Sequence, residues 1–224
     1  MRVTPIEGHR IWAAGYDRGP SPLLALETRV VLERLPALPG FRFLDVACGT
    51  GRWMRLAQQR GAQVSGVDLC PEMLREAARK PGLAGRLSIG DASRLPVVGG
   101  ASDFTLCSFA LGYVASLRKA MAELARVTRK SARVMVTDLH PGGLAAGWIR
   151  AFRSNGQLYE LDHHPHPIAD WEAAAKAAGL ALEWRLDAYF AEPEREIFTQ
   201  AGKDSSFEEL RRIPAVLAMC WSKS

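Results

Sequence analysis

A pair of glycines, Gly49 and Gly51, follows directly on the apolar run Phe43-Leu44-Asp45-Val46-Ala47-Cys48. A strand that ends in such a turn and continues into a helix lets a ligand approach the backbone closely, and it directs free amide groups at that ligand. The third glycine of a dinucleotide fingerprint is replaced by Met54, and no Gly-Lys-Ser or Gly-Lys-Thr phosphate loop follows. The turn therefore predicts contact with an adenosine-like ligand, without either of these phosphate-binding motifs.

A carboxylate, Asp68, closes the next apolar run, seventeen residues beyond Gly51. A carboxylate at a strand end is placed to accept hydrogen bonds from both hydroxyls of an unphosphorylated ribose, and it repels a ribose phosphate. The alternative is that Asp68 only caps a helix that opens at Pro71, which is a common role for aspartate. We favour the ribose interpretation because the carboxylate coincides with the glycine turn.

The elements that position these residues follow from apolar periodicity, which alternates between strand and helix patterns along the chain. This order predicts an α/β fold: a Rossmann-like sheet of seven strands, mostly parallel, with helices on both faces. The last two strands are joined by a charged segment and are expected to pair antiparallel. The predicted strands are 41–47, 63–68, 86–90, 103–109, 132–138, 180–190 and 214–221. The predicted helices are 22–35, 52–60, 117–128, 168–178, one that opens at residue 71, and a short one near 143–152 within a loop.

The composition favours a single-domain protein with neither a membrane nor a nucleic-acid partner. The 224 residues are 48% hydrophobic, which is enough for one domain with an ordinary core. Four cysteines are scattered without a Cys-x-x-Cys pair, so we expect free, buried thiols in a reducing compartment. No apolar run is long enough to cross a membrane and no secretory signal is seen, which favours a cytoplasmic protein without a membrane partner. The net charge of +5 is spread along the chain, which argues against a nucleic-acid partner.

Together these segments resemble the class I S-adenosylmethionine-dependent methyltransferases, and in particular the small single-domain enzymes that act on metabolites. The resemblance is carried between Tyr16 and Asp138 by "LDVACGTG", "GVDLCPEML", "GDASRLPV" and "SDFTLCSFALGYV". It implies S-adenosyl-L-methionine as cofactor and S-adenosyl-L-homocysteine as product. The residues that the resemblance assigns to the cofactor are Tyr16, Asp45, Ala47, Cys48, Gly49, Gly51, Asp68, Leu69, Asp91, Ala92, Cys107, Ser108 and Phe109.

Two positions depart from the pattern of the family. The family often has glycine where this chain has Ala47, and its Lys-Pro-Gly-Gly turn before the fifth strand is Arg129-Lys130-Ser131-Ala132 here. Alanine adds only one methyl group, so we expect cofactor binding to survive. The resemblance also implies a single domain over 1–224, with a helical cap at 1–36 and insertions at 140–167 and 191–212 that cover the acceptor side.

Methyl transfer from a sulfonium is an in-line displacement, so a protein contributes mainly by aligning the reactants and excluding water. Tyr16, Phe109 and Tyr113 are candidate pocket walls, because a sulfonium is stabilised near aromatic faces, although the last two also suit an ordinary core. If the acceptor is a hydroxyl or an acidic carbon, His140 is the candidate general base, since it directly follows the fifth strand. The alternative is a loop histidine bonded to Asp138 or to solvent.

Three further histidines, His163, His164 and His166, stand in a proline-rich segment. We expect no metal there, because prolines turn these side chains in different directions and no cysteine lies nearby. The histidines are instead expected to line or gate the acceptor pocket.

The sequence favours a small-molecule acceptor and leaves two other functions open. A nucleic-acid methyltransferase is one, but the segment after the fourth strand is Cys107-Ser108-Phe109-Ala110 rather than Asn/Asp-Pro-Pro-Tyr, and no Pro-Cys nucleophile is present. A cofactor-binding sensor without transferase activity is the other. The sequence carries no signal for an oligomeric state.

Overall fold

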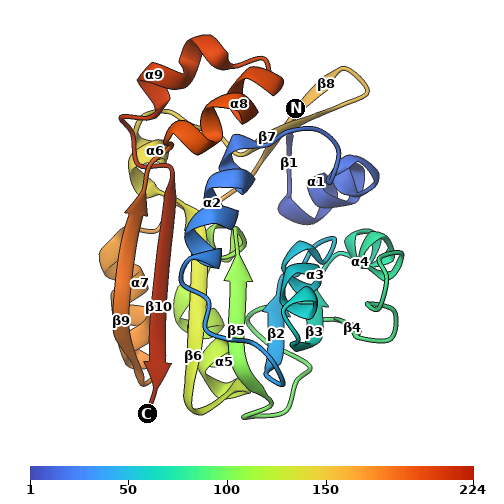
Figure 1. Ribbon diagram of the computed structural model, residues 1–224, viewed down its shortest axis with the longest axis vertical. Coiled ribbons are helices and arrows are strands. Elements are labelled where there is room, and N and C mark those ends of the chain that lie inside the picture. The colour runs from blue at the N-terminus through green and yellow to red at the C-terminus, as the bar shows by residue number, and fades with distance from the viewer.

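The computed structural model, which covers residues 1–224, is built around one large β-sheet (Figure 1). Its strands are β2 (Arg42–Val46), β3 (Gln63–Asp68), β4 (Leu87–Ile89), β5 (Ser102–Ser108), β6 (Thr128–Leu139), β9 (Leu180–Ala188) and β10 (Val216–Lys223). They lie in the order β4-β3-β2-β5-β6-β10-β9. The strands β4, β3, β2, β5 and β6 pair in parallel, whereas β10 is antiparallel to both β6 and β9. The predicted seven-stranded, mostly parallel sheet and its antiparallel C-terminal pair are confirmed.

Helices cover both faces of this sheet, because consecutive strand residues alternate between two buried clusters. Phe43 and Met135 belong to one cluster, and their neighbours Leu44 and Val136 belong to the other. The first cluster includes side chains of α2, α3, α8 and α9, and the second includes those of α5 and α7. The helices are α2 (Pro22–Leu32), α3 (Arg52–Gln59), α4 (Pro71–Ala78), α5 (Leu117–Val127), α7 (Ile168–Ala177), α8 (Glu192–Gln200) and α9 (Phe207–Leu210).

The strand order reverses at β2. From β2 the chain passes outward to β3 and β4, and it then returns to β5 on the opposite side of β2 before continuing to β6. In an open parallel sheet, ligands bind outside the carboxyl ends of the strands at such a reversal. The loops that follow β2 and β5 are therefore the expected edges of a binding site.

The N-terminal residues form a cap with a segment from the middle of the chain. They contain β1 (Arg2–Val3), the helix α1 (Pro5–Trp12) and a 3₁₀ turn, η1 (Ala13–Gly15). The strand β1 pairs in parallel with β8 (Gln157–Leu161), and β8 pairs in an antiparallel hairpin with β7 (Ala151–Ser154). Figure 1 shows this small sheet and α1 beyond the ends of β2 and β3.

The segment 140–167 corrects one expectation. The short helix predicted near 143–152 is instead α6 (Pro141–Ala145), and the hairpin of β7 and β8 follows where a loop was expected. The two strands are joined by Asn155 and Gly156, both with positive φ (49° and 78°), as a two-residue hairpin turn requires. The hairpin is stable here because β1 adds a third strand and Phe152 stacks on Trp12 at 4.7 Å.

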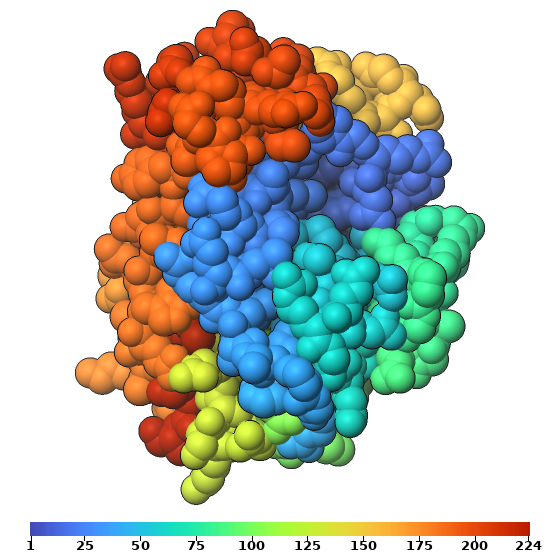
Figure 2. All heavy atoms as spheres, viewed as in Figure 1, coloured from blue at the N-terminus to red at the C-terminus, as the bar shows by residue number.

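The segment 191–212 contains α8, a 3₁₀ turn, η3 (Asp204–Ser206), and α9. Figure 2 shows these residues and the N-terminal part of the chain side by side at one end of the molecule. Arg29 of α2 binds the buried carboxylate of Glu194 in α8 with two hydrogen bonds, of 2.8 and 2.9 Å. The C-terminal insertion is thus held on α2 by a bidentate ion pair as well as by apolar packing. None of the helices is both long and apolar enough to span a membrane.

Candidate functional site

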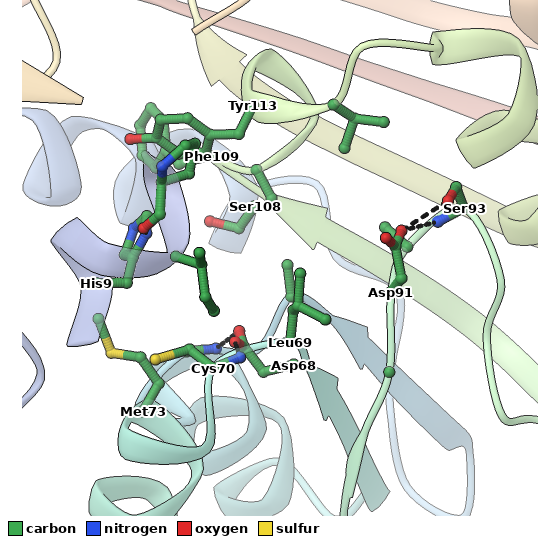
Figure 3. A pocket seen from close by; sticks show the side chains of 18 of the residues that line it. His9, Asp68, Leu69, Cys70, Met73, Asp91, Ser93, Ser108, Phe109 and Tyr113 are labelled. Atoms are coloured by element: carbon green, nitrogen blue, oxygen red, sulfur yellow. Dashed lines mark hydrogen bonds between the residues drawn. The ribbon is translucent and has the colours of Figure 1, made fainter. Parts of the chain in front are cut away.

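A cavity of about 500 Å³ opens at the carboxyl ends of β2, β3, β4 and β5, within the size range of small-molecule sites (Figure 3). The cap closes one side of it. Of the residues assigned to the cofactor from the sequence, nine line this cavity: Tyr16, Ala47, Gly49, Asp68, Leu69, Asp91, Ala92, Ser108 and Phe109. The topology therefore brings together side chains from five separate segments of the chain.

Asp68 connects the two loops that border the cavity. Its Oδ2 accepts a hydrogen bond from the Gly49 amide (2.8 Å), and its Oδ1 accepts one from the Cys70 amide (2.7 Å). Burial raises the pKa of Asp68, while these amides act in the opposite direction. The helix α4 has Cys70 as its N-cap and no side-chain cap, so the helix-capping interpretation of Asp68 is wrong. The bond from the Cys70 amide instead fixes the turn before the helix. It is compatible with ligand binding, because each carboxylate oxygen has a second lone pair.

Three residues on the cavity wall have left-handed backbone conformations. Gly49 has φ +54°, and a Cβ built on it would meet no atom within 4 Å, so the space above it is open. Ala47 (φ +56°) and Phe109 (φ +50°) adopt the same region without being glycine. Such strain at the ends of β2 and β5 is common where a backbone is shaped for a ligand. A glycine at position 47 would adopt this conformation without strain.

Ala47→Gly is expected to raise the free energy of unfolding by about 0.5–1 kcal/mol. Relief of the left-handed conformation gains about 1–2 kcal/mol, and the added freedom of the unfolded chain removes about 0.5–1 kcal/mol of that gain. Chemical denaturation of both proteins measures the difference. A variant that is less stable than the parent would show that the Ala47 methyl group contributes packing that outweighs the strain.

The loop after β4 forms the end of the cavity that lies away from the cap. Asp91 accepts hydrogen bonds through Oδ1 from the amide and hydroxyl of Ser93, both at 2.7 Å, which fixes the loop in a turn. Leu69 is 50% exposed although it is apolar, and it lies on the wall of the cavity between Asp68 and Asp91. An exposed leucine inside a concave site offers an apolar face for a flat ring.

Aromatic side chains gather at the cap end, where Figure 3 shows His9, Phe109 and Tyr113 close together. Tyr113 belongs to a 3₁₀ turn, η2 (Leu111–Tyr113), and its ring meets that of His9 edge-on at 5.3 Å. Tyr16 packs on Trp12 at 4.6 Å. Burial raises the pKa values of Tyr16 and Tyr113, so both phenols are neutral at physiological pH.

Four assigned residues lie beneath the cavity rather than on its wall: Asp45, Cys48, Gly51 and Cys107. Oδ2 of Asp45 is buried without a hydrogen-bond partner, and burial raises the pKa of this carboxyl to about 8, against the influence of Arg52. Burial also raises the pKa values of Cys48 and Cys107, which keeps both thiols protonated. All four cysteines of the chain are free and buried, as predicted.

Gly51 has a structural reason to be glycine. It is the N-cap of α3 with φ +78°, and a Cβ there would lie 2.7 Å from a methyl group of Leu83. The residue therefore sets the close packing of the turn that carries Gly49 into the cavity.

His140 lies outside the cavity wall. It caps α6, where its Nδ1 accepts a hydrogen bond from the Gly142 amide (2.8 Å). Its Nε2 is 3.2 Å from a carboxylate oxygen of Asp187. The ring is therefore neither in the acceptor pocket nor bonded to Asp138, the two positions that the sequence suggested. The general-base role of His140 stays a prediction, and the position of the side chain does not support it.

The three histidines of the proline-rich segment also lie off the cavity wall. Nε2 of His166 is 2.9 Å from the carbonyl oxygen of Val114, a cavity residue, so this histidine supports the wall from behind. No group of three potential ligand side chains is close enough to hold a metal ion.

Among the residues near the cavity that were not identified from the sequence, His9 and Glu27 carry titratable groups. His9 lines the cavity from α1. Glu27 is fully buried in α2 and accepts hydrogen bonds from Ser108 and Thr137, both at 2.6 Å, as well as from Arg52. Glu27 thereby fixes the hydroxyl of Ser108 at the end of β5. No local pattern marks either residue, because the partners of Glu27 and the Tyr113 neighbour of His9 lie far away in the sequence.

Comparisons with known proteins agree with this geometry. A family model described as "Methyltransferase domain" matches residues 44–136. The malonyl-acyl-carrier-protein O-methyltransferase of Serratia marcescens is 36% identical over 136 residues, which are 59% of this chain and 51% of that protein. The demethylmenaquinone methyltransferase of Beutenbergia cavernae is 32% identical over 192 residues, with 78% of this chain and 75% of that protein covered.

Solved structures show the same fold. An S-adenosylmethionine-dependent methyltransferase from Mesorhizobium loti matches with a TM-score of 0.70 at 21% identity, and the match covers 90% of this chain and 99% of that one. The chain spans 51% and 62% of the lengths of two malonyl-acyl-carrier-protein methyltransferases that it matches. The chain belongs to the class I S-adenosylmethionine-dependent methyltransferases, and S-adenosylmethionine is the cofactor of this family.

Proposed function

We propose that this protein transfers the methyl group of S-adenosylmethionine to a small-molecule acceptor by in-line displacement, driven mainly by positioning. The observation that supports this most is the shape of the single cavity at the strand reversal. A carboxylate and an open glycine turn form one part of its wall, and neutral aromatic side chains form another. A nucleoside and a second molecule can therefore share one water-poor space.

The cofactor is proposed to lie along the residues assigned to it from the sequence. The carboxylate of Asp68 would accept the ribose hydroxyls, and the space above Gly49 would admit the sugar close to the backbone. Leu69 and Ala92 would contact the adenine ring, with Asp91 at its edge. Asp45 lies beneath the cavity wall, so it would act on the methionine end indirectly, by supporting the turn that carries Gly49.

S-adenosylmethionine supplies an electrophilic methyl group on a positively charged sulfur. The residues of this chain hold and shield that reaction. Tyr16, Phe109 and Tyr113 offer aromatic faces that stabilise a cation, and their burial keeps water from the reacting atoms. The hydroxyl of Ser108, held by Glu27, borders the same space.

We also propose that the chain is one domain whose cap and insertions cover the acceptor side. Residues Pro5, Ile6, His9 and Tyr16 of the segment 1–36 line the cavity directly. The segments 140–167 and 191–212 contribute no lining residue. The segment 140–167 supports the cap through the pairing of β8 with β1, and the segment 191–212 packs on α2 through the Arg29–Glu194 ion pair.

Incubation with methyl-labelled S-adenosylmethionine tests the function. The protein is given a low-molecular-mass fraction and a purified RNA and DNA fraction of a bacterial extract, and label is followed into each. We expect label in small molecules. Label in nucleic acid would support a nucleic-acid methyltransferase instead, and tight binding of S-adenosylhomocysteine without transfer to any fraction would support a sensor.

A further inference from the structure

We propose that His9, on the cap helix α1, is the general base of the reaction, and that the acceptor atom is a hydroxyl oxygen that still carries its proton when it binds. This proposal rests on the proposed methyl transfer. It names a residue for which the sequence offers no motif and a class of acceptor that the fold alone does not define. Four observations support it: the tautomer of the ring, its position, its charge environment and the composition of the cavity.

The tautomer follows from one contact. Nδ1 of His9 lies 2.7 Å from the carbonyl oxygen of Pro5, one turn earlier in the same helix. A carbonyl oxygen can only accept a hydrogen bond, so Nδ1 must carry the proton. In a neutral imidazole, Nε2 then has a free lone pair. The helix itself prepares the ring to accept a proton at Nε2.

The position of the ring is fixed by its neighbours. His9 stacks on Trp12, with ring centroids 6.3 Å apart, and meets Tyr113 edge-on at 5.3 Å. The side chain lines the cavity together with Phe109, on the side that the cap closes (Figure 3). Figure 3 shows His9 and Asp91 on opposite sides of the cavity with Asp68 between them, so a base at His9 lies at the end away from the proposed adenine position.

The charged and titratable groups around His9 come from several elements. Burial lowers the pKa of His9, and the positive charge of Arg150 acts in the same direction, whereas the Pro5 carbonyl and Asp68 of β3 act against them. Tyr16 and Tyr113 also face the ring, and both are neutral. His9 is therefore unprotonated at neutral pH and ready to act as a base.

Methyl transfer to the hydroxyl requires only the acceptor, S-adenosylmethionine and His9. The acceptor hydroxyl gives its proton to Nε2 of His9 while an oxygen lone pair forms the bond to the methyl carbon. The bond from that carbon to sulfur breaks, and its electron pair stays on sulfur to give S-adenosylhomocysteine. The imidazolium of His9 then returns its proton to water when the product leaves.

The composition of the cavity selects the kind of hydroxyl. Ile6, Met73, Phe109 and Val114 make much of the wall apolar, which suits an aromatic or otherwise apolar alcohol. A carboxylate acceptor needs no base, and it would need a buried cation. Arg150 is already paired with Asp138, and Lys119 is exposed at the edge of the cavity. We therefore assign a phenol-like hydroxyl rather than a carboxylate.

The state of His9 is tested without any acceptor by ¹⁵N NMR of the histidine rings, with His9→Gln used to assign its signals. We expect the Nδ1–H tautomer at pH 7 and a pKa for His9 below the ordinary 6.5. An imidazolium at pH 7, or the Nε2–H tautomer, would overturn the proposal. Glutamine keeps a donor for the Pro5 carbonyl, so the same variant serves in the kinetic test if His9→Ala does not fold.

The catalytic role is tested with two matched acceptors, 1-naphthol and 4-nitro-1-naphthol, at pH 7.5. The first is protonated and the second is ionised, so only the first needs a base. We expect His9→Ala and His9→Gln to lower kcat for 1-naphthol by about 10²–10⁴-fold, a general-base effect. The rate with 4-nitro-1-naphthol should change less than about threefold. The Kd of S-adenosylhomocysteine should also change less than about threefold, which corresponds to about 0.6 kcal/mol.

Equal losses with both acceptors would make His9 a positioning residue and contradict the proposal. Failure of the parent protein to methylate either hydroxyl would overturn the assigned acceptor class. Neither result would disprove the methyltransferase itself, because label from S-adenosylmethionine could still reach other small molecules in the extract.

Discussion

Asp68→Ala is expected to abolish detectable binding of S-adenosylhomocysteine, with a loss of about 10²–10⁴ in affinity. The carboxylate is proposed to hold both ribose hydroxyls, and hydrogen bonds to a charged group contribute about 1.5–3 kcal/mol each. The change also frees the amides of Gly49 and Cys70, which the carboxylate now binds at 2.8 and 2.7 Å. Both effects weaken the same site, so isothermal titration calorimetry should show little heat.

Asp68→Asn is the matched variant, because it retains the shape and one acceptor oxygen. We expect it to bind about tenfold more weakly than the parent, which corresponds to about 1.4 kcal/mol. NAD serves as the control ligand, and the parent should not bind it, since Met54 replaces the third glycine of a dinucleotide turn. Binding of S-adenosylhomocysteine to folded Asp68→Ala with nearly unchanged affinity would remove Asp68 from the site.

The large sheet and the loops that border the cavity were predictable because their signals are local. Each strand is a short apolar run, and the strands that lead to Gly49 and Asp68 end in residue types suited to a close backbone approach and to a ribose. A parallel sheet then brings these ends to one edge without further information. Nine of the thirteen residues assigned to the cofactor accordingly lie on the cavity wall.

The cap was less predictable, although two signals were present. Thr4 and Glu7 form a capping box at the start of α1, and Asn155-Gly156 is a strong hairpin turn. What the sequence does not contain is the pairing of β1 with β8, across more than 150 residues. That pairing decides which side of α1 faces the sheet, and therefore whether His9 points into the cavity.

His140 shows why a strand end alone does not define a catalytic residue. Its position after β6 was correctly predicted, but the direction of the ring depends on α6 and on Asp187 of β9. Glu27 and Arg150 were not predictable for the same reason, because the role of each depends on a partner on another element. Tertiary contacts of this kind leave no periodic pattern in the sequence.

Asp138→Ala is expected to lower the free energy of unfolding by about 3–5 kcal/mol, the usual cost of leaving one member of a buried ion pair alone. Asp138 binds the guanidinium of Arg150, and both side chains are almost fully buried. Its carboxylate also accepts hydrogen bonds from the amides of Gly112 and Leu139, both at 2.7 Å. For a chain of this length the loss corresponds to a fall in Tm of about 6–20 °C.

The matched control is the double variant Asp138→Leu with Arg150→Met, which removes both charges and keeps apolar volume. It should recover at least about 2 kcal/mol relative to Asp138→Ala, because an apolar pair replaces a buried ion pair at small cost. Arg150 lies 4.7 Å from the ring of Tyr113, so the double variant should also loosen the aromatic wall and weaken acceptor binding. Equal unfolding free energies for single and double variants would show that the two charges do not depend on each other. Recovered stability together with weakened acceptor binding is the expected result, and it would mean that the ion pair holds the acceptor wall in place more than it stabilises the fold.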